Sequence, residues 1–121
     1  MNVVIVEDSE LIQKWLQRLL VSVPGVEVVG VAAAQDEAIA MIDRLEPDLV
    51  TLDMALSPGH GFNVLKALRQ AGHTCKVLVL TNQDTGPLRP MAEQLGADGL
   101  YDKSLDVATV LEQVRAWAQP D

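Results

Sequence analysis

The residues of this chain best suited to chemistry are polar side chains that directly follow short apolar segments. They are an acid pair, a single acid, a hydroxyl and a lysine: Glu7, Asp8, Asp53, Thr81 and Lys103. Two carboxylates about 4 Å apart repel each other by roughly 4 kcal/mol at an effective dielectric near 20. Three acids that meet at one place therefore need a cation, which Lys103 and an oxygen-seeking Mg²⁺ ion can provide together.

Such a group of side chains suits phosphoryl transfer, because catalysis of that reaction depends mostly on positioning and charge neutralisation. Asp53 offers a carboxylate nucleophile. Lys103 and Mg²⁺ would hold the phosphoryl oxygens, and the Thr81 hydroxyl would donate to one of them. None of these residues is diagnostic alone, since an acid after an apolar segment is common. The case rests on all of them meeting at one place.

The elements that would position these residues are five short segments, four of them continuously apolar and rich in β-branched residues. Strands that are buried on both faces of a parallel sheet have this composition. We predict strands at residues 3–6, 26–31, 49–52, 77–80 and 99–101. Apolar residues at helical spacing separate them. We predict a helix capped by Ser9 and ended by Pro24 and Gly25, and further helices at residues 36–45, 62–70 and 106–118.

The fourth helix of this pattern is the least regular. Gly86, Pro87 and Pro90 occupy its expected beginning, and proline inside a helix removes a hydrogen bond and clashes with the preceding turn. We therefore predict that it begins late, near Pro90, and ends at about Leu95, with Gly96 as its C-terminal stop.

Five strands that alternate with five helices require right-handed crossovers and give a three-layer α/β/α sandwich around a parallel sheet. Ligands of such sheets bind at the carboxyl ends of the strands. The five polar residues all follow strands and should therefore converge at one edge.

Length and charge limit the classes of function. The 121 residues fit a single domain, and a net charge of −8 with scattered basic residues argues against binding of nucleic acid or an anionic membrane. No apolar run approaches the roughly 20 residues of a membrane span. Cys75 is the only cysteine, so no intramolecular disulfide can form and a reducing cytoplasm is the expected location.

The chain resembles the response-regulator receiver domains of bacterial two-component systems over its whole length, in the manner of the single-domain chemotaxis regulators. The stretches that carry the resemblance are VVIVEDSELI, PDLVTLDMALSPGHGFNVLKALR, VLVLTN and GADGLYDKS. The spacing also agrees, with Asp53 45 residues after Asp8, Thr81 28 residues further on and Lys103 22 beyond that.

The resemblance implies a flavodoxin-like (βα)5 fold with strand order 2-1-3-4-5. It implies that Asp53 is the phosphoacceptor and that Mg²⁺ binds Asp8, Asp53 and the Ala55 carbonyl, with Glu7 acting through water. Thr81 would be the switch hydroxyl and Lys103 the phosphate partner.

The implied partners are a histidine kinase or a histidine phosphotransfer protein and an unidentified downstream protein. A weak or phosphorylation-dependent dimer is compatible with this. Residues 1–121 would be one receiver domain without an effector domain, and its only catalysis would be of its own phosphorylation and dephosphorylation.

Three positions depart from the family pattern. Leu100 stands where the family usually has an aromatic residue, and alternation along the strand directs Tyr101 to the other face. Ser104 follows Lys103 where the family usually has proline, so we predict a trans peptide bond. Asn82 follows Thr81 where the family often has alanine, and its larger side chain would restrict access to the phosphoryl group.

Two alternatives stay open from the sequence. A phosphohydrolase of the haloacid-dehalogenase type also places an aspartate nucleophile after an apolar strand, although it requires a second aspartate where this chain has Ala55. A degenerate receiver that binds partners without phosphorylation is the other, and the complete set of acids, Thr81 and Lys103 argues against it.

Overall fold

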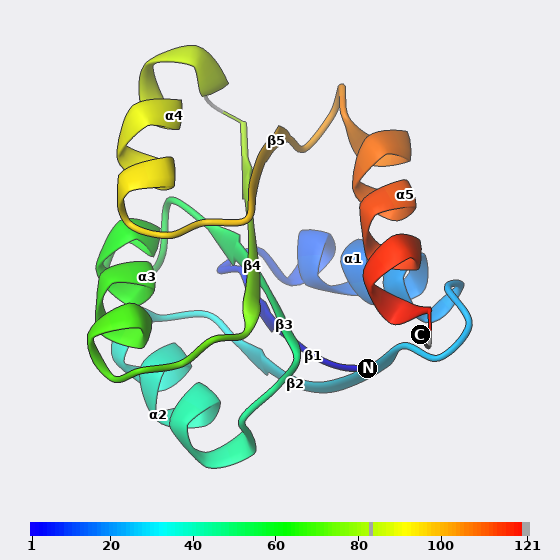
Figure 1. Ribbon diagram of the computed structural model, residues 1–121, viewed down its shortest axis with the longest axis horizontal. Coiled ribbons are helices and arrows are strands. Elements are labelled where there is room, and N and C mark those ends of the chain that lie inside the picture. Colours follow the sequence, from blue (N-terminus) through cyan, green and yellow to red (C-terminus); the bar gives the residue numbers. More distant parts are fainter. Residues whose placement is uncertain (83, 120–121) are drawn as a thin grey trace.

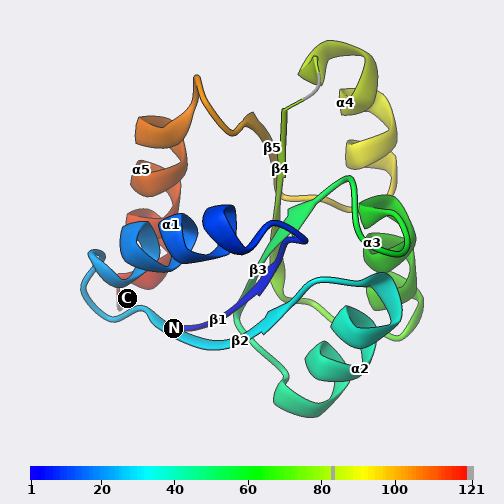
Figure 2. The ribbon, with the colours of Figure 1, turned by 180° about the vertical axis from the view of Figure 1, so that it is seen from behind.

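The computed structural model describes residues 1–82 and 84–119. A parallel five-stranded sheet lies between two layers of helices (Figures 1 and 2). The strands are β1 (Asn2–Val6), β2 (Glu27–Ala32), β3 (Leu49–Asp53), β4 (Lys76–Thr81) and β5 (Gly99–Asp102), in the order β2-β1-β3-β4-β5. The predicted (βα)5 fold, strand order and three layers are therefore confirmed.

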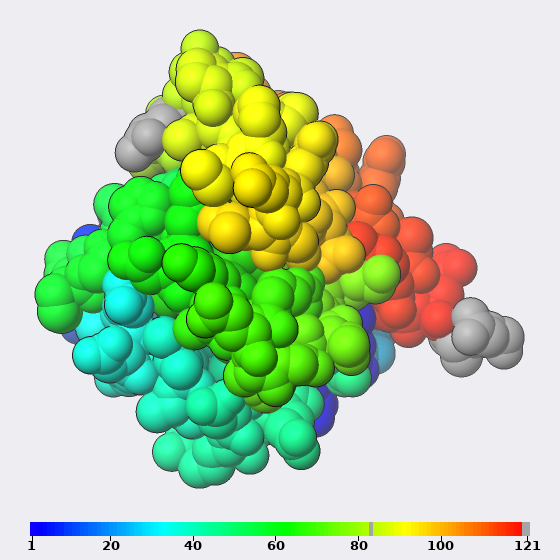
Figure 3. Space-filling view, turned by 60° about the vertical axis from the view of Figure 1, so that its left-hand side comes forward, coloured from blue at the N-terminus to red at the C-terminus, as the bar shows by residue number. Residues whose placement is uncertain are grey.

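The helices divide between the two faces of the sheet. They are α1 (Glu10–Val21), α2 (Gln35–Leu45), α3 (Gly61–Gln70), α4 (Thr85–Gln94) and α5 (Val107–Ala118). Helices α1 and α5 cover one face, and α2, α3 and α4 cover the other, where they form one continuous side of the molecule in the space-filling view (Figure 3). None of the helices in the described residues is long and apolar enough to cross a membrane.

Each central strand contributes to both halves of the core. In β1, Val4 and Val6 pack on the side of α2 to α4, whereas Val3 and Ile5 pack on the side of α1 and α5. Side chains alternate between the two faces of a strand, and both faces of this sheet are covered. Buried positions on both faces of these strands are therefore mostly apolar, which explains the apolar segments of the sequence.

The sequence placed most element boundaries within one residue. The Ser9 hydroxyl accepts a hydrogen bond from the Ile12 amide at 3.4 Å and caps α1 as predicted. The third and fourth strands each extend one residue further than the apolar run, so that Asp53 and Thr81 are their last residues.

The prediction for the fourth helix was wrong about its beginning. Helix α4 begins at Thr85, five residues before Pro90, with the Asp84 carboxylate accepting from the Gly86 amide at 3.1 Å. Amides in the first turn of a helix have no partner within the helix, so Pro87 costs little there. Pro90 lies inside α4 and removes one bond, which this surface helix tolerates. The predicted end is confirmed, because Gly96 follows the helix with φ +92°.

The predictions for the last strand are confirmed. Leu100 is buried on the face of α4, and Tyr101 packs on the opposite face with α5. The Lys103–Ser104 peptide bond is trans, because within the described residues the cis bond lies at Ser57–Pro58.

One buried polar group in the sheet has no partner among the described residues. The Thr51 hydroxyl lies in β3, and the side chain is almost fully enclosed. A buried hydroxyl without a hydrogen bond lowers stability, by about 1–3 kcal/mol in typical cases.

Replacing Thr51 with valine should therefore stabilise the protein, because valine keeps the branched shape and removes the unpaired hydroxyl. We expect Thr51→Val to raise the free energy of unfolding by about 1 kcal/mol in urea denaturation. The reverse change at a buried position of the adjacent strand, Val79→Thr, should lower it. An unchanged or lower stability of Thr51→Val would show that this hydroxyl has a hydrogen-bond partner in solution.

Candidate functional site

The carboxyl edge of the sheet brings together the polar residues that the sequence singled out. Glu7 follows β1, Asp53 ends β3, Thr81 ends β4 and Lys103 follows β5. One pocket at this edge is lined by all of the predicted site residues, namely Glu7, Asp8, Asp53, Ala55, Thr81 and Lys103, together with Asn82. The arrangement follows from the strand order, because β1 and β4 are the two neighbours of β3.

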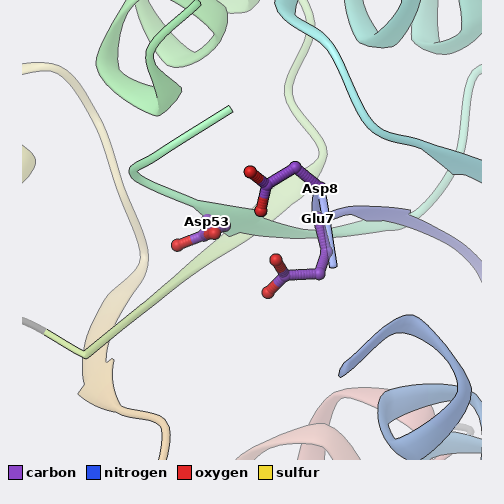
Figure 4. A group of neighbouring side chains, drawn as sticks. All are labelled: Glu7, Asp8 and Asp53. Atoms are coloured by element: carbon purple, nitrogen blue, oxygen red, sulfur yellow. The ribbon is translucent and has the colours of Figure 1, made fainter. Parts of the chain in front are cut away.

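Three carboxylates form the acidic part of the site. Glu7, Asp8 and Asp53 each offer one oxygen, and these oxygens lie within 4.8 Å of one another. Their side chains converge beside the ends of β1 and β3 (Figure 4). Asp8 is the most exposed of the three, and its Oδ2 accepts a hydrogen bond from the Ser57 hydroxyl at 3.1 Å. Such a cluster of carboxylate oxygens is the donor set that hard divalent cations prefer.

Lys103 supplies the positive charge of the site. Its Nζ lies 2.5 Å from Glu7 Oε1 and 3.2 Å from Asp53 Oδ1, and all three side chains are buried. One ammonium group cannot neutralise three carboxylates, so the ionised cluster carries an excess of two negative charges. A divalent cation fits both the charge and the oxygen ligands of this site.

The environment of Glu7 opposes its ionisation. The pKa of Glu7 is raised from 4.5 to about 7, mainly by burial and also by the nearby Asp53 carboxylate, against the lowering by Lys103 and the Ser9 amide. The Ser9 amide donates to Glu7 Oε2 at 3.1 Å, and the Gln13 side chain donates to the Glu7 carbonyl at 2.6 Å. Helix α1 therefore fixes the position of Glu7 through its first turn.

Ala55 lies in the turn that connects β3 to α3, and it lines the pocket. The two hydrogen bonds that close this turn run from the Gly61 amide to the Met54 carbonyl, at 2.8 Å, and from the Leu56 amide to the Gly59 carbonyl, at 3.3 Å. Neither bond uses the Ala55 carbonyl, and Ala55 lines the pocket with Asp53.

Thr81 and Asn82 form the wall of the pocket at the end of β4. Thr81 is buried, and its carbonyl accepts a hydrogen bond from the Lys103 amide at 2.9 Å, which joins the ends of β4 and β5. Asn82 lines the same pocket as Asp53 and Lys103.

Comparison with known proteins identifies the family. The family model of the response regulator receiver domain matches residues 3–115. The chain belongs to this family. The match also decides against the haloacid-dehalogenase alternative.

The relatives include regulators with different overall organisation. The chain is 35% identical over 118 residues to the nitrate/nitrite response regulator protein NarP of Escherichia coli, covering 98% of this chain and 55% of NarP. It is also 35% identical over 109 residues to protein-glutamate methylesterase/protein-glutamine glutaminase 5 of Myxococcus xanthus, covering 89% of this chain and 31% of that protein. The receiver thus spans about half or less of these curated relatives.

A solved structure gives the same fold. The chain aligns with the crystal structure of the CheX-CheY-BeF3-Mg+2 complex from Borrelia burgdorferi with a TM-score of 0.88 and 26% identity. The alignment covers 99% of this chain and 90% of the other. The fold of this receiver is therefore also found in that solved structure.

Several residues that support the site were missed by reasoning from the sequence. Gly61 begins α3 against the backbone of β3, where a Cβ atom would overlap the Asp53 carbonyl oxygen. The Gln35 side chain accepts from the His60 amide and from the Asn63 side chain, each at 3.1 Å, and holds this loop to α2. No local sequence signal identifies Gln35, because its partners are distant in the chain.

Adding a methyl group at Gly61 should disturb the receiver beside its acceptor. We expect Gly61→Ala to lower the free energy of unfolding by about 1–3 kcal/mol in urea denaturation, because the backbone of Asp53 and Met54 must shift. Gly86→Ala is the matched control, since its Cβ would lie 3.5 Å from Asp84 Oδ1, an ordinary contact. A loss no greater than that of the control would contradict the close approach at Gly61.

The raised pKa of Glu7 predicts a specific dependence of stability on pH. The folded protein holds a proton on Glu7 that the unfolded chain has released, so this contribution is full below about pH 4.5 and is lost as the pH rises through about 7. The side chain of Glu7→Gln cannot ionise. Its free energy of unfolding, relative to that of the wild type, should therefore increase between pH 5 and pH 8 by on the order of 3 kcal/mol in urea denaturation without Mg²⁺. Glu10→Gln, at an exposed acid, controls for the lost charge. If the free energies of unfolding of Glu7→Gln and the wild type differ by the same amount at pH 5 and pH 8, the raised pKa of Glu7 is contradicted.

Proposed function

We propose that this receiver takes a phosphoryl group onto Asp53 from a histidine kinase or a histidine phosphotransfer protein and relays the signal through a change in its surface. The observation that carries the proposal is the position of Asp53. Its carboxylate lies 3.2 Å from the Lys103 ammonium and within the carboxylate cluster, on a pocket open to solvent.

The transfer step needs no general base at the acceptor. An ionised Asp53 oxygen forms the new O–P bond, while the N–P bond of the donor histidine breaks and its electron pair stays on the nitrogen. Lys103 compensates charge on the phosphoryl oxygens, because its ammonium already contacts the acceptor. The Thr81 hydroxyl, at the end of the adjacent strand, would donate to a phosphoryl oxygen and so couple β4 to the modified Asp53.

The site suits Mg²⁺. Asp8, Asp53 and the Ala55 carbonyl would hold the ion directly, and Glu7 would act through a water. When bound, Mg²⁺ neutralises charge on the phosphoryl group and the acidic residues. The support for this assignment is the donor set, since three carboxylates face a single lysine.

The proposal has consequences for the location and the output of this domain. Residues 1–121 would act as one receiver domain in the cytoplasm, whose only chemistry is its own phosphorylation and dephosphorylation. The output would pass to a downstream protein by surface contact, or through a phosphorylation-dependent dimer. Position 100 is a leucine that is buried under α4, so the rotamer of an aromatic side chain at that position would not take part in the response to phosphorylation.

Phosphorylation can be tested by incubating the protein with acetyl phosphate and Mg²⁺ and measuring its intact mass. We expect a single phosphoryl increment that disappears in Asp53→Ala and in a metal-free reaction. Asp48→Ala is the matched control. Asp48 directly precedes β3, at the end of that strand opposite to Asp53, and its carboxylate accepts a hydrogen bond from the Asn2 amide at 2.7 Å. This variant should be modified like the wild type.

The opposite result is equally informative. If neither acetyl phosphate nor a panel of phosphorylated histidine kinases adds a phosphoryl group, the relay is excluded. A receiver that binds its partner without phosphorylation then becomes the working hypothesis, and Asp53→Ala should leave that binding intact.

A further inference from the structure

The turn between β5 and α5 determines where Lys103 stands. Lys103, Ser104 and Leu105 form this turn, at the carboxyl edge of the sheet (Figure 1). The Lys103 ammonium contacts Glu7 and Asp53, so the backbone of the turn must hold its Cα at the right place. Apolar packing does not anchor the tip of the turn, because Leu105 is 83% exposed. Hydrogen bonds must do so instead.

The Asp102 carboxylate organises the turn. Its Oδ1 accepts from the Ser104 amide at 2.8 Å, the Ser104 hydroxyl at 2.7 Å and the Leu105 amide at 3.0 Å. These bonds, the one from the Ser104 hydroxyl first, hold the pKa of Asp102 below its ordinary value. The Asp102 carboxylate therefore bonds to the two residues that follow Lys103 and fixes the backbone after Lys103. Proline at position 104 would have neither donor of Ser104.

A second carboxylate closes the turn from the other end. The Asp106 Oδ2 accepts from the Asp102 amide at 2.8 Å, and the Asp106 amide donates to the Asp102 carbonyl at 3.1 Å. Asp106 occupies the N-cap position of α5, yet its side chain makes no capping bond to that helix. Its carboxylate points back to the strand and leaves the usual capping role unfilled.

We propose that Asp102 is a positioning residue for Lys103, and that its carboxylate, with Asp106 closing the turn, holds the ammonium group against Asp53. This proposal rests on the proposed phosphorylation of Asp53. The Lys103 amide is fixed separately, by its bond to the Thr81 carbonyl at 2.9 Å. Asp102 thus fixes the backbone after Lys103, whereas β4 fixes the amide of Lys103 itself.

The test compares rates of phosphorylation by acetyl phosphate in Mg²⁺, followed by intact mass, in Asp102 and Lys103 variants. Asp102→Ala should slow the reaction about tenfold, because a loosely held Lys103 is displaced from the acceptor. Asp102→Asn should restore most of the rate, because its amide oxygen can accept the same bonds. In the Lys103→Ala background, Asp102→Ala should cause no further loss, because the residue acts through Lys103.

A matched control separates positioning from general stability. Asp98 precedes β5, and its carboxylate accepts from the Val77 amide at 2.9 Å and pairs with Arg69. Asp98→Ala removes a comparable carboxylate at the far end of the same strand and should leave the phosphorylation rate of the folded protein near that of the wild type.

If Asp102→Ala does not fold, Asp106→Ala and Ser104→Ala test the same turn by removing single bonds, and both should slow phosphorylation only when Lys103 is present. The proposal is overturned if the folded Asp102 variant, or both of these milder variants, react like the wild type. It is also overturned if the losses add to that of Lys103→Ala. A wild-type protein that takes up no phosphoryl group would instead refute the proposed function itself.

Discussion

The repulsion among Glu7, Asp8 and Asp53 is the constraint on which the rest of the structure depends. Adjacent strands β1 and β3 deliver these acids to one point, and the fold cannot relax by moving them apart without breaking the register of the sheet. Lys103 offsets only part of the charge, and the Asp53 carboxylate adds to the effect of burial, which is the main cause of the raised pKa of Glu7. Repulsion among the ionised carboxylates is therefore unfavourable, and the proposed Mg²⁺ would relieve it.

The free energy that offsets the repulsion at this site comes from packing elsewhere in the molecule. The central strands carry apolar residues on both faces and lie between two helical layers. Apolar packing is therefore complete before the strands reach their carboxyl ends, where the site lies. At the carboxyl ends of the strands, hydrogen bonds of backbone groups hold the site residues in place. The Ser9 amide holds Glu7, the Gly61 amide fixes the Met54 carbonyl, and Thr81 joins the end of β5. A rigid sheet with loops tied by hydrogen bonds is a general way to place charged groups accurately.

Much of the fold and site could be read from the sequence, because the signals are local. A continuous apolar run followed by an acid identifies a buried strand and its end, and parallel topology then collects the ends at one edge. Helix α4 shows where a local rule misleads, since the cost of proline depends on whether its amide would have had a partner. The close approach at Gly61 and the bonds of Gln35 depend on segments far apart in the chain, which no single window of sequence contains.

Strand β5 is the edge strand on the side of the sheet that carries Lys103. The strands β1, β3 and β4 have neighbours on both sides, whereas β5 pairs only with β4. Two of its residues pack against the helical layers, Leu100 toward α4 and Tyr101 toward α5, and Asp102 leads into the turn that carries Lys103. This edge strand therefore connects the turn of Lys103 to both helical layers, whereas the central strands that carry the acids are paired on both sides.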